Sequence, residues 1–243
     1  MLRTPKFLIR SPIPLLAVLA ILQPVCASQD QLPKWEVAPI GLAGSWERAD
    51  DVVVGDVSNI VALGSEKISD PPWPVSSTIH EIYWCRADFH ADSVVKGKIP
   101  TPGKKLIWAA IRPGCGFEWF RYGYEETTPP VTRVWFVRED GEYIRPAVDG
   151  GGVFFASFHA SFSASGKPED RKRFAYLFLN PGALGMSPAH YALILHNPVE
   201  LARAILGETE CADALRALSS YPDVKLHDSA CGYLEHSFRQ SCK

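Results

Sequence analysis

The chain has 243 residues, of which 47% are hydrophobic and 21% charged, and its 25 basic side chains nearly balance its 27 acidic ones. This length suffices for one sizeable hydrophobic core or two small ones. Because there is no basic excess, charge gives no reason to expect nucleic acid or an anionic membrane as a partner.

Residues 1–27 have the features of a secretory signal peptide. Three basic residues precede an apolar run over 15–22, and the sequence Val25-Cys26-Ala27 follows. We expect cleavage after Ala27. The apolar run is shorter than the roughly 20 residues that a membrane span requires, and the residues before Cys26 are not the small ones of a lipoprotein site. The mature chain is expected to be secreted or periplasmic, with 22 basic against 27 acidic residues and no later segment apolar enough to cross a bilayer.

Residues 28–45 are expected to form an extended lead-in. The stretch 46–64, WERADDVVVGDVSNIVALG, then places Asp50, Asp51 and Asp56 around a run of β-branched residues. Such residues favour strands, so the run predicts a strand and the acids mark its ends. A cation site is the alternative interpretation, but the adjacent Asp50 and Asp51 point to opposite sides of an extended chain.

The region 46–158 is predicted to contain five or six antiparallel strands. Apolar and polar residues alternate over 76–95, which indicates one long, curved strand. A Pro-Gly turn leads to its partner strand, KKLIWAAI, and Asp140-Gly141 between two apolar runs is a strong hairpin signal. We expect these strands to close on themselves as a small barrel.

Aromatic residues crowd one short segment of this region. They are Phe117, Trp119, Phe120, Tyr122 and Tyr124. A thin barrel cannot bury aromatic side chains on both sides of one segment, so Trp119, Phe120, Tyr122 and Tyr124 are candidate ligand-binding residues for a glycan or a peptide. The alternative is that these rings pack between the barrel and the helices that follow it.

The C-terminal part of the chain is predicted to be helical. Residues 159–186 are expected to be a linker and residues 187–243 a subdomain of helical hairpins. Ser187 and Asn197, each followed by proline, have the pattern of an N-cap before a proline in the first turn. The fold class is therefore α+β, with a small antiparallel β-barrel followed by a C-terminal helical subdomain.

Five cysteines remain in the mature chain, and in an exported protein they are expected to form disulfides. Cys85 and Cys115 lie symmetrically about a turn near residue 100, and Cys211 and Cys231 lie symmetrically about residue 221. Residues equally distant from a hairpin turn tend to face each other, so we predict the bridges Cys85–Cys115 and Cys211–Cys231. Cys242 is left free or available to a partner chain.

The strand pattern resembles the netrin-like domain, the OB-type barrel of tissue inhibitors of metalloproteinases. The matching stretches are ADDVVVGDVSNI for the first strand, YWCRADFHADSVVKGK for the second and GKKLIWAA for the third. The resemblance implies an OB-type barrel over about 46–158. It does not extend to metalloproteinase inhibition, because those inhibitors place an amino-terminal cysteine of a Cys-x-Cys motif on the catalytic zinc. Here Ser28 would come first, and Cys-x-Cys does not occur.

A zinc site can be assembled on paper from His227, Cys231, His236 and Cys242, since His227 and Cys231 are one helical turn apart. Cys231 is better explained as a disulfide partner, and His236 lies off the same stripe, so no metal is expected. No cofactor is expected either, because the common hydrolase, zinc and haem motifs are missing.

These features predict an exported, non-enzymatic protein that acts in binding or in envelope assembly, with a protein or glycan as its partner. The oligomeric state is left open. One alternative is a hydrolase-type enzyme whose site is assembled from scattered residues, namely Asp56, His80, Asp88, His90, Glu118 and Asp149. The other alternative is a protease inhibitor that acts through a loop.

Overall fold

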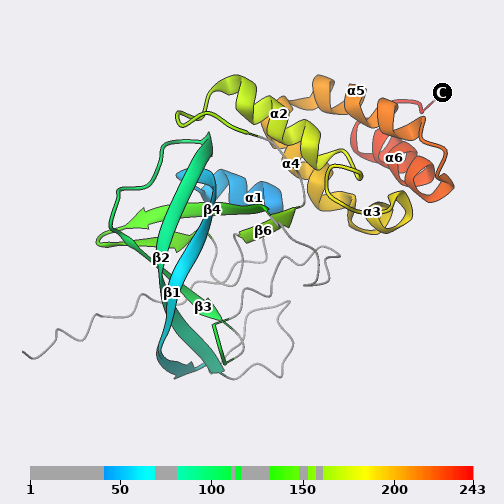
Figure 1. The fold of residues 1–243 in the computed structure, drawn as a ribbon. Coiled ribbons are helices and arrows are strands. Elements are labelled where there is room, and N and C mark those ends of the chain that lie inside the picture. Colours follow the sequence, from blue (N-terminus) through cyan, green and yellow to red (C-terminus); the bar gives the residue numbers. More distant parts are fainter. Residues whose placement is uncertain are drawn as a thin grey trace, which may run out of the picture. The chain divides into compact units, whose positions relative to one another are not determined.

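The computed structural model describes residues 41–68, 81–110, 113–115, 132–147, 153–156 and 161–242. Within them the chain forms six helices and six strands, so the fold is α+β (Figure 1). The strands are β1 (Asp51–Lys67), β2 (Glu81–Lys96), β3 (Lys105–Ala110), β4 (Thr132–Asp140), β5 (Tyr143–Pro146) and β6 (Val153–Ala156). The helices are α1 (Leu42–Arg48), α2 (Pro168–Phe178), α3 (Pro188–Ile194), α4 (His196–Leu206), α5 (Glu208–Ser219) and α6 (Val224–Ser237).

Five of these strands form a small closed barrel. Their order is β1-β2-β3-β5-β4, and the ring closes where residues 51–54 of β1 pair with residues 134–137 of β4. Strand β6 pairs with β4 as an addition to the ring. The pairing is antiparallel except between β3 and β5, which run parallel. The expectation of a wholly antiparallel barrel is therefore corrected at this one contact.

Strands β1 and β2 are long and bent. They pair at 13 positions, and their register shifts four times between Val52 and Gly64. Such shifts are β-bulges, which bend a strand and increase its twist. Gly55 lies at one of them, where a Cβ atom would collide with the carbonyl oxygen of His90. Only glycine fits at this bend, and a glycine inside a strand commonly marks a bulge of this kind.

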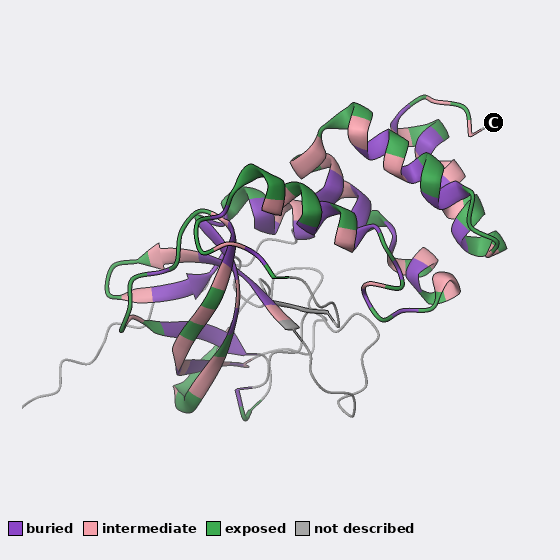
Figure 2. Cartoon of the chain, turned by 45° about the horizontal axis from the view of Figure 1, so that its top comes forward, coloured by how far each residue is buried: buried purple, intermediate pink, exposed green. Residues whose placement is uncertain are grey.

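The barrel interior is filled by one side of each strand. Its largest members are Trp108 and Trp135, and Nε1 of Trp135 donates a hydrogen bond to the carbonyl oxygen of Gly55 over 2.9 Å. The outer half of β1 does not take part in this core, since residues 58–67 are half-buried or exposed. Figure 2 shows β1 changing from buried to exposed along its length.

A second core joins the outward side of the barrel strands to the helices. Phe136 of β4 belongs to the same buried cluster as Phe174 and Phe178 of α2. Trp46 of α1 stacks on Phe174, with the ring centroids 6.3 Å apart. The stretch 159–186 is therefore more than the linker that we expected, because it contains α2, whose apolar side completes this core.

Helices α3 to α6 lie in the region where the sequence predicts helices. Ser187 caps α3 as predicted, since its Oγ accepts a hydrogen bond from the N–H of His190 over 3.3 Å. The predicted cap at Asn197 is wrong, because α4 already begins at His196 and Asn197 lies in its first turn. In the part of the chain that the structure describes, no helix has both the length and the apolar character needed to cross a bilayer.

Candidate functional site

Strand β1 carries a bulge in its outer half, at Asn59 and Ile60. The pairing there advances three residues along β1 while it advances two along β2, so one residue of β1 is extra. Asn59 has a φ of 53°, a left-handed conformation that asparagine adopts more readily than most residues. Its Nδ2 donates a hydrogen bond to Oδ2 of Asp88 over 2.6 Å, which holds the bulge against β2. The bulge thereby leaves the side chain of Ile60 exposed.

A polar network surrounds this bulge. The Asp88 carboxylate accepts hydrogen bonds from Asn59 and from Lys105 of β3. These two donors, Asn59 first and Lys105 second, lower the pKa of Asp88. Beside them, Oγ of Ser58 and Nε2 of His90 are hydrogen-bonded over 2.9 Å. The network therefore holds a fixed negative charge and a fixed positive charge on the outer side of the barrel.

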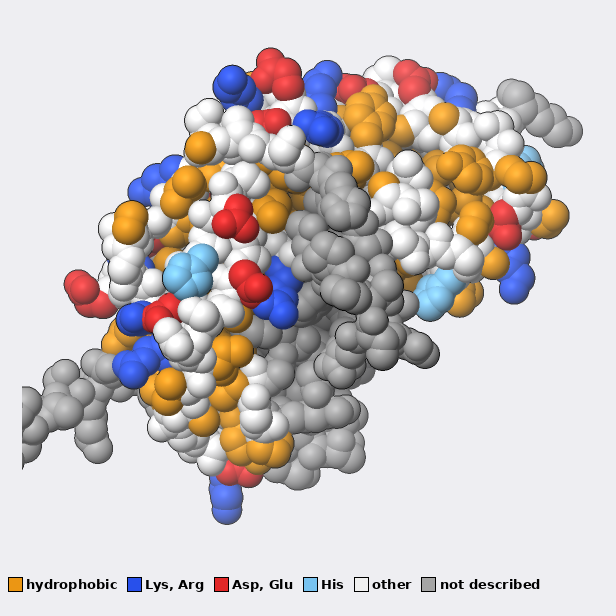
Figure 3. All heavy atoms as spheres, viewed as in Figure 1, with side chains coloured by type: hydrophobic (Ala, Val, Ile, Leu, Met, Phe, Trp, Pro, Cys, Tyr) orange, Lys and Arg blue, Asp and Glu red, His pale blue; other side chains and the backbone are white. Residues whose placement is uncertain are grey.

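The network borders a hollow of about 200 Å³, which we call the barrel hollow. Its lining residues are Asn59, Val61, Arg86, Ala87, Asp88 and Lys105. Val61 is 46% exposed and the neighbouring Ile60 is 48% exposed. Figure 3 shows basic, acidic and histidine side chains interspersed with hydrophobic ones over the β1–β2 ribbon. Two exposed aliphatic side chains beside fixed charges form a surface suited to binding.

Half of the residues nominated for an enzymatic site lie near this surface. Asp88 and His90 belong to the polar network, and Asp56 forms an ion pair with Arg133 of β4. The other nominated residues, His80, Glu118 and Asp149, lie outside the described residues. The aromatic candidates for ligand binding, Trp119, Phe120, Tyr122 and Tyr124, also lie outside them.

The side chains of Asp50 and Asp51, at the start of β1, do not point toward a common cation site. Asp51 is 2% exposed, and its Oδ1 accepts a hydrogen bond from the N–H of Lys98 over 2.8 Å, whereas Asp50 is exposed. Burial raises the pKa of Asp51. Next to it, Nζ of Lys96 donates to the carbonyl oxygens of Trp46 and Ala49 at the end of α1. These contacts fasten α1 to the barrel. Asp50 and Asp51 mark the start of β1 as predicted, but the prediction is wrong for Asp56, which lies within the strand and pairs with His90.

A second hollow, of about 350 Å³, lies between α3 and α6. Its lining residues are Ala192, Leu193, His196, Ser229, Gly232, Tyr233, His236 and Ser237. The rings of His196 and Tyr233 are stacked with centroids 6.0 Å apart, and Leu193 is 80% exposed. The lining residues of this helix hollow include two histidines and two serines but no acidic side chain, so the hollow has no counterpart of the Asp88–Lys105 ion pair.

The cysteines follow the prediction in the barrel and depart from it in the helices. Cys85 and Cys115 form the predicted disulfide with their Cα atoms 5.7 Å apart, although the residue opposite Cys85 on β3 is Trp108 and Cys115 lies beyond that strand. The predicted bridge Cys211–Cys231 is wrong, because Cys231 is bonded to Cys242 and Cys211 is free and buried. Cys211 faces the helical core, and its Sγ lies 3.7 Å from the carbonyl oxygen of Val199.

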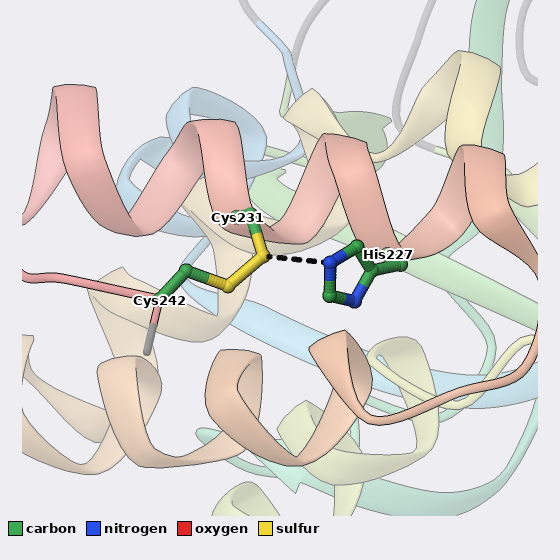
Figure 4. Close-up of side chains that lie close together, drawn as sticks. All are labelled: His227, Cys231 and Cys242. Atoms are coloured by element: carbon green, nitrogen blue, oxygen red, sulfur yellow. Dashed lines mark hydrogen bonds between the residues drawn. A yellow bond between two sulfur atoms is a disulfide. The ribbon is translucent and has the colours of Figure 1, made fainter.

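The structure also brings His227 next to the second disulfide. The ligand atoms of His227, Cys231 and Cys242 lie within 4.8 Å of one another (Figure 4). The fourth residue of the zinc set considered from the sequence, His236, lines the helix hollow instead.

Sequence reasoning missed the residues that define the barrel hollow, apart from Asp88. Asn59, Ile60, Val61 and Lys105 carry no motif. The one available signal was the polar pair Ser58-Asn59 within a β-branched run, since such an interruption is typical of a bulge. Even this signal does not show which side chains the bulge exposes.

Comparison of the chain with protein-family models, with curated proteins and with solved structures finds no match. The barrel and its outer surface are therefore the observations from which a function is inferred.

Proposed function

We propose that this chain is an exported, non-enzymatic binding protein with an OB-type, netrin-like barrel that holds a protein partner over the barrel hollow. The five-stranded ring supports the type of barrel, since OB folds are small five-stranded barrels. OB folds bind their ligands on the side formed by the second and third strands. The barrel hollow is lined by three residues of β2 and one of β3, which is the corresponding side of this barrel.

The observation that carries the proposal is the exposure of Ile60 and Val61 beside the Asp88–Lys105 ion pair. Protein interfaces combine an apolar centre with a polar rim that carries hydrogen bonds. The exposed apolar side chains of this surface, Ile60 and Val61, are aliphatic, whereas glycans are usually held by aromatic platforms. The surface therefore favours a protein partner over a glycan.

The state of Asp88 favours binding over acid–base catalysis. Its two hydrogen-bond donors lower the pKa of its carboxylate, so the carboxylate keeps its charge at neutral pH. A general acid or base works best with a pKa near the operating pH. A constant charge next to exposed aliphatic side chains suits recognition, because it contributes specificity and steers association.

The expected export agrees with the cysteine chemistry. The described residues contain two disulfides, and such bonds persist in oxidising compartments. The leader over residues 1–27 has the basic start, the apolar run and the small-residue end of a signal peptide. The proposal therefore places the binding partner in the periplasm or outside the cell.

The test is recovery of partners by the mature chain from its native envelope fraction, compared between variants. The Ile60→Asp, Val61→Asp double variant should lose recovery of the partner by at least about tenfold, because buried interface centres carry most of the binding energy. Leu193→Asp is the control, since it introduces an aspartate at an exposed aliphatic residue of the helix hollow, and the single variant Val61→Asp matches it in charge. Thermal unfolding checks that each variant is folded.

Equal recovery by the wild-type chain and by the double variant would contradict the proposal. Loss of the partner with Leu193→Asp alone would move the binding surface to the helix hollow and would also contradict it.

A further inference from the structure

The half-buried disulfide of the helical region has an imidazole at its side. His227 and Cys231 lie one turn apart on α6, and Cys242 reaches them from the segment that follows this helix (Figure 4). Nε2 of His227 lies 3.6 Å from Sγ of Cys231. One histidine nitrogen and two cysteine sulfurs, the atom types that bind zinc in proteins, therefore lie close together.

The contacts of the His227 ring determine which nitrogen can bind a cation. Nδ1 is hydrogen-bonded to the carbonyl oxygen of Ser219. A carbonyl oxygen only accepts, so Nδ1 carries the hydrogen, and in the neutral ring Nε2 presents its lone pair toward Cys231. Metal-binding histidines are commonly oriented in this way, with the other ring nitrogen donating to a backbone carbonyl. The site thus already has an outer contact that orients its imidazole.

In the oxidised state neither Sγ of Cys231 nor the unprotonated Nε2 of His227 carries a hydrogen that the other atom could accept. Reduction supplies one, because a thiol at Cys231 can donate to Nε2. The separation also suits a cation: tetrahedral zinc with bonds of about 2.3 Å to sulfur and about 2.0 Å to nitrogen places these two atoms about 3.5 Å apart, close to the observed 3.6 Å. The arrangement of His227 and Cys231 on one helix therefore already has the spacing of two zinc ligands.

We propose that reduction of the Cys231–Cys242 bond creates a Zn²⁺ site composed of His227, Cys231 and Cys242. A dithiol reductant transfers two electrons and two protons to the bond, which gives two thiols, and the reductant becomes a disulfide. Zn²⁺ then replaces one proton on each thiol and accepts the lone pair of Nε2, so two protons are released. Three protein ligands leave a fourth position open for water or another ligand.

The remaining cysteines are separated from this site. Cys211 is buried in the helical core, and burial raises the pKa of its thiol to about 12. Cys85 and Cys115 are bonded to each other inside the barrel. The half-buried pair Cys231–Cys242 is therefore the bond that a reductant reaches first.

The experiment is a Zn²⁺ titration of the mature chain against a chromophoric chelator, before and after treatment with a phosphine reductant that is then removed. The reduced chain should bind one equivalent of Zn²⁺, and the oxidised chain should bind none at the same concentration. Mass mapping of the alkylated chain establishes which cysteines were reduced. Co²⁺ serves as a second probe, because sulfur coordination in a tetrahedral site gives intense visible absorption.

Variants separate the three-ligand site from binding by thiols alone. His227→Ala and His227→Gln should each weaken Zn²⁺ binding by the reduced chain by about tenfold or more, and Cys231→Ser should abolish it. His236→Ala is the matched control on the same helix and should bind as the wild-type chain does. Circular dichroism checks the fold of each variant. Equal binding by the reduced and oxidised chains, or wild-type affinity in either folded His227 variant, would overturn the proposal.

Discussion

The two disulfides lie in contrasting surroundings. In the barrel, Cys85 and Cys115 are 0% and 4% exposed and belong to the interior cluster, and their bond spans 30 residues of sequence. In the helical region, Cys231 and Cys242 are half-buried, and their bond spans 11 residues. The barrel bond is thus part of a core that excludes solvent and stabilises the strands around it. The helical bond is accessible to reductants and has a metal-binding side chain beside it.

The two cores differ in a second way. The barrel interior is built from strands and the segment that holds Cys115. The helical core combines residues of the helices with residues on the outward side of β1 and β4. Val52 packs into the helical core while its neighbour Val53 packs into the barrel interior. Because the same strands border both cores, we expect the barrel and the helices to unfold as one cooperative unit.

The largest effect is expected from Trp135→Ala in the barrel interior. The Trp135 side chain is fully buried, contacts the ring of Phe89 edge to face at 5.4 Å and donates to the backbone of Gly55. Its loss should lower the free energy of unfolding by about 3–5 kcal/mol. Phe178→Ala is the matched variant in the helical core. Denaturant unfolding followed by far-ultraviolet and near-ultraviolet circular dichroism should give coincident, shifted transitions for each variant. A helical signal that keeps its wild-type midpoint in Trp135→Ala would show that the two regions unfold independently.

The second-largest effect is the loss of stability when either disulfide is removed. Replacing Cys85 and Cys115 by alanine should cost about 4 kcal/mol of stability, and replacing Cys231 and Cys242 about 3 kcal/mol, because a longer loop restricts the unfolded chain more strongly. For the buried barrel pair this figure includes the cost of a small cavity. Urea unfolding of the two double variants measures the difference. A larger loss for the helical pair would reverse the comparison.

The smallest effect concerns acid sensitivity. Hydrogen bonds from Lys104 and then Thr101 lower the pKa of Glu139, in the barrel, to about 2. Since this value lies below that of the unfolded chain, the charged form stabilises the fold above about pH 4.5, and this contribution is lost as the pH falls toward 2. Glu139→Gln should cost about 1 kcal/mol at pH 7 and should flatten the acid limb of the stability curve.

Glu210 in the helices is the control for that prediction. Tyr176 and then Lys172 lower the pKa of Glu210 through hydrogen bonds. Urea midpoints between pH 2 and pH 7 should change less in Glu210→Gln than in Glu139→Gln. An equal flattening in both variants would show that acid sensitivity is shared by the two regions.

Local features of the fold were predictable from the sequence. Asp140-Gly141 indicated a hairpin, and the structure pairs Asp140 with Tyr143 across that turn. Ser187 indicated the start of a helix, and its hydroxyl caps α3. The bridge Cys85–Cys115 was also predicted correctly, although the symmetry argument does not account for it, because the residue opposite Cys85 on β3 is Trp108 and Cys115 lies beyond the end of β3.

The same symmetry argument failed for Cys211 and Cys231. Helices repeat every 3.6 residues, so two positions equally distant from a turn between helices need not face each other. Cys211 shares the buried side of α5 with Leu215 and Leu218, whereas the half-buried Cys231 meets Cys242. The direction in which the apolar side of each helix faces depends on how the helix packs against its neighbours. The spacing of the cysteines in the sequence does not reveal that direction.

By itself, the sequence determined where β1 to β5 and the helices after residue 187 form, because alternation, turn residues and caps act over a few neighbouring residues. It did not predict α2 within the expected linker or the start of α1 within the expected extended lead-in. The tertiary structure decided how β1 and β4 close the barrel, which side chains the bulge at Asn59 exposes, and which cysteine Cys231 meets. Each of these depends on a contact between segments that are distant in the chain. Such contacts are selected by the packing of the whole core and not by the residues of either segment alone.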